Sequence, residues 1–74
     1  MKSLDDYIEE RNRLFLAALS ISNTFSDRIW TELGVANRHI NRLIKGTLQL
    51  NMVRQEMDRC FEKVSGLIEE KKNA

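Results

Sequence analysis

The most regular pattern of apolar residues lies in the last third of the chain. Apolar side chains recur there every three or four positions for nearly five turns, at Val53, Met57, Cys60, Phe61, Val64, Leu67 and Ile68. This spacing places them on one side of an α-helix. Asn51 can cap the start of this helix, and Lys71 and Lys72 complement the negative end of its dipole. We therefore expect a long, amphipathic C-terminal helix.

A second long helix is expected at the N-terminus. Ser3 followed by Asp6 is a variant of the capping box, and apolar residues then recur at helical spacing from Leu4 to Leu19. Between Leu14 and Ile21 the apolar surface is wider than one stripe, so this part of the helix must be buried on several sides. In so short a chain, we expect one of those sides to contact another protein. The predicted dimer or partner interface consists of Leu14, Phe15, Leu16, Leu19 and Ile21.

The middle of the chain predicts two shorter helices. Residues 20–26 are rich in Ser, Asn and Thr, which compete for backbone hydrogen bonds and favour a break, with Thr24 or Ser26 as the next cap. Gly34 then stands where a helix end favours a positive φ, and Gly46 is the natural stop of the following helix. The apolar sides of this pair are Ile29, Trp30 and Leu33 before Gly34, and Ile40, Leu43 and Ile44 after it.

These elements predict an all-α fold: a small bundle of three to four helices within a single domain, residues 1–74. Its order is a long N-terminal helix, a short helix pair around Gly34, and a long C-terminal helix. The alternative is a two-helix hairpin folded at Gly34, because a heptad-like apolar series runs through positions 4 to 33 and resumes at 36. The absence of proline and the presence of only three glycines favour helix in both versions.

Composition indicates where extra stability must come from. A 74-residue chain buries only about 60% of the surface that its unfolded form exposes, so such domains are marginal without a staple or a partner. Cys60 is the only cysteine and His39 the only histidine, too few for a disulfide within the chain or a soft-ligand zinc site. We therefore expect self-association, most simply as a homodimer.

Charge is distributed unevenly although the net charge is only +1. Between Leu33 and Gln55 there is no acidic residue, while Arg38, Arg42, Lys45 and Arg54 carry positive charge. A polar, basic stretch without acids is typical of proteins that bind an anionic partner. It is equally typical of a solvated helix face.

The segment from Ser26 to Gly46 resembles the helix-turn-helix of small bacterial and phage regulators. Leu33 and Val35 flank a glycine, as in that family, and Ile40, Leu43 and Ile44 take the later apolar positions; Trp30 stands where the family usually has a small residue. The resemblance implies that the second helix of the pair enters the major groove of DNA. The outward residues that it implies as DNA-binding are Asn37, Arg38, Asn41, Arg42 and Lys45, and their chemistry suits base recognition.

The sequence contains no pattern typical of a catalytic site. His39 lies on a polar helix face without a Ser or Cys at nucleophile spacing, and Cys60 falls on an apolar stripe. We therefore expect no enzyme activity, cofactor, metal or small-molecule substrate. No apolar run approaches the roughly 20 residues of a membrane span, and the lone cysteine favours the cytoplasm.

Two functions remain from the sequence. The first is a small regulator that binds DNA as a dimer through the helix-turn-helix-like segment. The alternative is a protein-binding helical adaptor, secretion chaperone or inhibitor that acts through its apolar helix faces.

Overall fold

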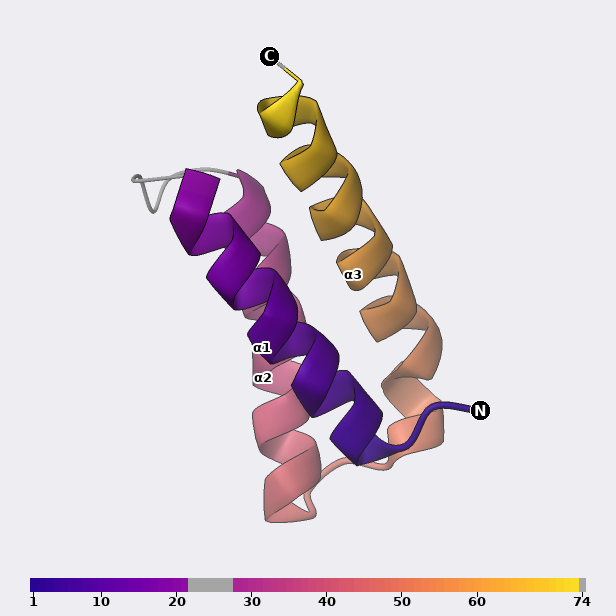
Figure 1. Ribbon diagram of the computed structural model, residues 1–74. Helices are drawn as coiled ribbons and strands as arrows, with labels where there is room; N and C mark the ends of the chain where they lie inside the picture. Colours follow the sequence, from indigo (N-terminus) through magenta and orange to yellow (C-terminus); the bar gives the residue numbers. More distant parts are fainter. Residues whose placement is uncertain (22–27, 74) are drawn as a thin grey trace.

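In the part of the chain that the structure describes, three α-helices form an up-down-up bundle. The computed structural model describes residues 1–21 and 28–73, and its elements are α1 (Leu4–Ile21), α2 (Arg28–Lys45) and α3 (Leu50–Lys72). Figure 1 shows α1 and α2 lying alongside each other, with α3 beside both. The N-terminal ends of α1 and α3 lie at the same end of the bundle, where Tyr7 contacts Asp58. The predicted all-α bundle of three to four helices is confirmed.

All three helices contribute to one core. The largest fully buried side chains are Tyr7, Leu14, Ile29, Ile40, Met57, Phe61 and Val64. The stripe predicted for the C-terminal helix is confirmed: every member is buried except Leu67, which packs partly buried against the others. Tyr7 and Phe61 lie close across α1 and α3, with ring centroids 6.1 Å apart. The core therefore joins the first helix of the chain directly to the last.

The predicted break at Gly34 is wrong. α2 runs through Gly34 without interruption, so neither the short helix pair nor the two-helix hairpin folded at this residue describes the chain. The physical reason is the phase of the buried residues, which continues at helical spacing across the glycine: Ile29, Leu33, Ala36, Ile40 and Leu43. A glycine inside a helix costs about 1 kcal/mol relative to alanine, whereas fully burying one of these larger side chains gains about 1.5–3 kcal/mol. Packing therefore outweighs the glycine.

The turn from α2 to α3 has a specific cause at Gly46. Its φ is +78°, the left-handed conformation that glycine tolerates, which confirms the predicted helix stop. The Gly46 N–H donates to the Leu43 carbonyl at 3.1 Å, and the Thr47 N–H donates to the Arg42 carbonyl at 3.0 Å. These two bonds form a Schellman motif.

Two finer predictions near this turn are wrong. The N-cap of α3 is Gln49 rather than Asn51, which lies inside the first turn. Ile44 was expected inward but is 58% exposed, because the bundle's core ends at Leu43 on this side of α2. The predicted capping residues Thr24 and Ser26 lie outside the described residues.

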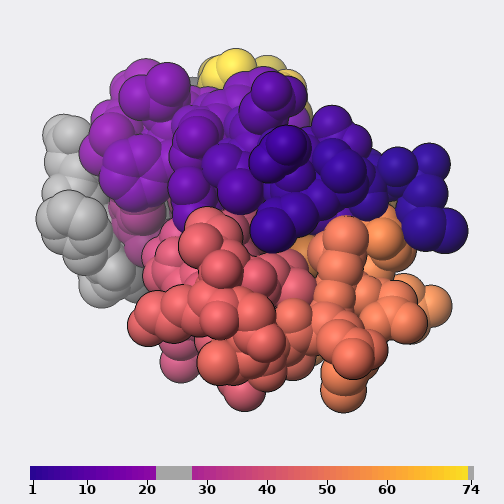
Figure 2. Space-filling model, turned by 90° about the horizontal axis from the view of Figure 1, so that it is seen from below, coloured from indigo at the N-terminus to yellow at the C-terminus, as the bar shows by residue number. Residues whose placement is uncertain are grey.

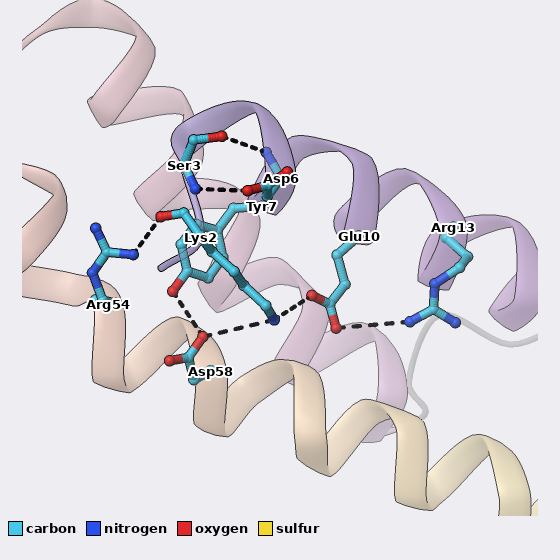
Figure 3. A network of polar contacts seen from close by, with 8 residues as sticks. All are labelled: Lys2, Ser3, Asp6, Tyr7, Glu10, Arg13, Arg54 and Asp58. Atoms are coloured by element: carbon cyan, nitrogen blue, oxygen red, sulfur yellow. Dashed lines mark hydrogen bonds and ion pairs between the residues drawn. The ribbon is translucent and has the colours of Figure 1, made fainter.

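Polar contacts fix the start of α1 against α3 (Figure 3). The predicted capping box is confirmed: the Ser3 N–H donates to Asp6 Oδ2 at 2.8 Å, and the Asp6 N–H donates to Ser3 Oγ at 3.2 Å. The Tyr7 hydroxyl donates to Asp58 Oδ1 at 2.8 Å, and an Arg54 N–H donates to the Lys2 carbonyl.

Figure 2 looks onto this end of the molecule. The N-terminal residues, in indigo, lie against both the end of α2 and the start of α3. Lys2 Nζ also lies 2.7 Å from Glu10 Oε2, and this hydrogen bond to a carboxylate raises the pKa of the Lys2 amine.

Candidate functional site

A groove of about 300 Å³ lies between α1 and α2. Its lining comes from both helices: Arg11, Asn12 and Phe15 from α1, and Trp30, Leu33, Gly34 and Asn37 from α2. Phe15, Trp30 and Leu33 give it apolar walls, whereas the arginine and the two asparagines are polar. A concave, mostly apolar site with a few polar groups is typical of a binding site.

The absent side chain at Gly34 helps to form this groove. A Cβ placed on Gly34 would meet nothing within 4 Å, so the space above it is open. Trp30 lies one turn earlier on the same side of α2, and its ring meets Phe15 edge-on with centroids 5.4 Å apart. The large residue and the small residue therefore stand next to each other along one helix, and the difference in size leaves a hollow.

Arg11 sits on the polar side of the groove and is held there by two amides. Its NH1 donates to Asn37 Oδ1 across the helix interface at 3.1 Å. Its Nε and NH2 donate to Asn12 Oδ1 at 3.2 and 3.1 Å. Both partners are neutral, and within residues 1–21 and 28–73 no carboxylate lies within ion-pair distance of this guanidinium. The groove thus carries a fixed positive charge.

The α1 side of the groove borders on exposed apolar side chains, which we call the apolar lip: Phe15, Leu16 and Leu19. They are 45%, 67% and 46% exposed. Two residues of the predicted interface do not belong to this lip. Leu14 is buried in the core of its own chain, and Ile21 packs partly buried against that core.

Beyond the groove, the exposed surface of α2 carries a row of basic side chains, which we call the basic ridge: Arg38, Arg42 and Lys45. All three are exposed, together with Asn41 beside them. Among the described residues, no acid lies within ion-pair distance of the ridge. These four residues are exposed, as an outward-facing position requires, and their role in DNA binding stays a prediction. Asn37 differs, because it is partly buried and accepts the hydrogen bond from Arg11.

The helix-turn-helix geometry is not present in the described structure, because the position of its turn lies inside α2. The resemblance rests on the spacing of the apolar residues from Ile29 to Ile44, but this spacing also fits one continuous helix. Trp30, which departs from the family pattern, contacts α1 instead of facing a second short helix.

The residues with catalytic or metal-binding chemistry are dispersed. His39 Nε2 lies 3.2 Å from Glu56 Oε1, between α2 and α3. Cys60 is buried, and burial, together with the nearby Glu32 carboxylate, raises the pKa of its thiol. Over residues 1–21 and 28–73 there is no group of three or more His, Cys, Asp and Glu side chains that could hold a metal ion. In the same residues, no helix has the length and apolar character needed to cross a membrane.

Sequence reasoning identified the apolar lip and the ridge but missed the groove. Arg11 and Asn37 are 26 residues apart, and their contact depends on how α1 packs on α2. The available signal was Trp30 followed four residues later by Gly34, a large and a small residue on one helix side. Comparison with known proteins finds no family model, no curated protein and no solved structure that matches this chain.

Proposed function

We propose that this protein is a non-enzymatic binding module whose α1–α2 groove receives an apolar side chain of a partner protein. The observation that carries the proposal is the apolar lip, where Phe15, Leu16 and Leu19 stay exposed directly beside a groove with apolar walls. Exposed apolar surface next to a concavity is characteristic of protein-interaction sites. A helix from a partner is the natural ligand, because its apolar face can fill such a groove.

The lip is large enough to matter energetically. Fully burying a Leu or Phe side chain gains about 1.5–3 kcal/mol. Because each lip residue is already partly covered, a partner that buried the rest would gain about 2–5 kcal/mol in total. Micromolar affinity corresponds to about 8 kcal/mol, so the lip can supply a substantial share of it.

Site-specific crosslinking in the native cell tests the proposal. A photo-crosslinking phenylalanine analogue replaces Leu16 in one variant and Met52 in the control. Met52 is also exposed and apolar, but it lies on α3 outside the groove. We expect one stoichiometric protein adduct from position 16 and none from position 52. Equal labelling at both positions, or adducts that disappear on nuclease treatment, would contradict the proposal.

The predicted homodimer would use the same lip. A second copy of the chain then covers Leu16 and Leu19 in the resting protein, and a partner must displace it. In the crosslinking experiment, the homodimer appears as an adduct with twice the mass of the chain.

DNA binding is the second candidate, and a different observation favours it. The basic ridge is exposed, free of acids and spread over the C-terminal half of an 18-residue helix. Such a face can contact phosphates, and its affinity would fall steeply with salt because counterions are released. An anisotropy titration with random duplex DNA at low salt tests this candidate. Loss of binding in Arg42→Ala supports it, and absence of binding by the wild type rules against it.

A further inference from the structure

The basic ridge adjoins the groove along the exposed surface of α2. Gly34 and Arg38 are one turn apart, and Asn37 and Asn41 follow the same spacing, so the open floor of the groove leads directly toward the ridge. At a rise of about 1.5 Å per residue, the ridge from Arg38 to Lys45 extends for about 10 Å beyond the groove. A helix of about four turns laid along α2 would therefore contact both.

Arg11 adds a directed positive charge at the groove itself. An arginine has five N–H donors, and three hydrogen bonds to Asn12 and Asn37 are present. The remaining donors belong to a guanidinium already held in place, which lowers the entropy cost of binding a carboxylate. Since its partners are neutral amides, the charge is not compensated within the described residues. The positive charges of the ridge are likewise not paired with an acid within the described residues.

We propose that the groove and the ridge together bind an acidic amphipathic helix of a partner protein. This rests on the proposed function and specifies the chemistry of the partner. An apolar side chain of the partner enters the groove over Gly34, beside the paired rings of Phe15 and Trp30. Carboxylates that precede and follow it pair with Arg11 and with the ridge. Complementary charge then sets the orientation of the helix and the rate of its association.

These observations favour an acidic helix over nucleic acid. A phosphate backbone would pair with the ridge, but it offers no apolar group for the walls of the groove or for the lip. The positive charge of Arg11 lies beside the apolar walls of the groove. An acidic peptide with an apolar side chain can therefore pair with this charge and fill the groove at the same time.

A display selection supplies the probe. A library of random helical peptides of about 16 residues is selected on the wild-type protein, and the best-enriched peptide is titrated by fluorescence anisotropy. Three variants are compared. In the ridge variant, Arg38 and Arg42 are both changed to Glu. The matched control changes Arg59 and Lys72 to Glu, which alters net charge equally on the exposed surface of α3. The groove variant is Gly34→Leu, with Gly34→Ala as a smaller change; circular dichroism checks that each is folded.

We expect the enriched peptides to be acidic and to contain a large apolar residue. The ridge variant should bind the chosen peptide at least about tenfold more weakly, and the α3 control should bind as the wild type does. Gly34→Leu should also abolish binding, because its side chain occupies the groove. Selection repeated on the ridge variant should enrich basic peptides instead.

Each of the other outcomes would contradict a specific part of the proposal. Enriched peptides without acidic bias, bound equally by the ridge variant but not by Gly34→Leu, overturn the acidic partner and leave the proposed function standing. Peptide binding that no groove substitution changes overturns the proposed function as well. If duplex DNA binds in a manner sensitive to the ridge and insensitive to Gly34→Leu, the ridge serves nucleic acid. If the wild type is a dimer that no selected peptide dissociates while Gly34→Leu is a monomer, a second copy occupies the groove.

Discussion

Replacing Gly34 with alanine should make the protein more stable. Gly34 lies inside α2, and alanine is favoured over glycine in a helix interior by about 0.8–1.0 kcal/mol. No steric cost opposes this gain, because a Cβ at this position would meet nothing within 4 Å. For a domain of this size, 1 kcal/mol raises the Tm by about 4–8 °C. Thermal and urea unfolding followed by far-ultraviolet circular dichroism measure the change, with an unchanged urea m value as a check that the denatured state is the same.

Two other glycines serve as controls. Gly66 lies inside α3 with equally open surroundings, so Gly66→Ala should raise the Tm by a similar amount. Gly46 has a φ of +78°, so Gly46→Ala should lower the stability by about 1–2 kcal/mol. A Gly34→Ala variant destabilised like Gly46→Ala would refute the reasoning, because it would mean that residue 34 has a left-handed backbone in a turn between two helices.

The same substitution separates stability from function. An alanine methyl group at position 34 projects into the groove, so Gly34→Ala should weaken partner binding while it strengthens the fold. Glycine at this position would then be a stability cost that the binding site requires.

Three further predictions follow from the surface, the helix start and the core. Leu16→Glu should remain folded, because Leu16 is 67% exposed, but it should abolish a dimer formed through the lip. Sedimentation equilibrium measures the oligomeric state, and a monomeric wild type would disprove the homodimer. The capping hydrogen bonds from Ser3 lower the pKa of the Asp6 carboxyl below its ordinary value of 3.8. The ionised carboxylate therefore stabilises the fold at pH values above 3.8, and this contribution is lost as the pH falls through the lowered pKa. The Tm of Asp6→Asn should therefore lie below that of the wild type at neutral pH and converge with it in acid; a difference independent of pH would contradict this. Because burial raises the pKa of Cys60, iodoacetamide should label this thiol slowly in the native protein and rapidly in urea, and equal rates would show that it is accessible.

Much of the fold was predictable because its signals are local. The stripe on α3, the capping box at Ser3 and the stop at Gly46 each depend on residues within a few turns of one another, and the structure confirms all three. The break predicted at Gly34 is wrong because glycine ends some helices and lies inside others. The deciding information was the phase of the apolar residues, which passes from Leu33 to Ala36 without the shift that a turn introduces.

The candidate site was less predictable because it depends on packing between helices. The exposed side chains of the ridge follow from helical periodicity alone. By contrast, the contact of Phe15 with Trp30 and that of Arg11 with Asn37 require the relative rotation of α1 and α2. The apolar width of α1 predicts an interface at Leu14, Leu16 and Leu19 alike, and it does not distinguish the exposed Leu16 and Leu19 from Leu14, which faces the core.

The polar contacts at the start of α1 have a consequence for the order of folding. Tyr7 to Asp58 and Lys2 to Arg54 join residues 51 and 52 positions apart, so these contacts must close a long loop. The hairpin of α2 and α3, joined by the Gly46 turn, needs only a short one. The hairpin should therefore form early, and the contacts between the start of α1 and α3 should form late in folding. Contacts that form after the transition state control the unfolding rate rather than the folding rate. The strength of this N-terminal attachment thus determines how long α1, and with it one wall of the groove, stays in place.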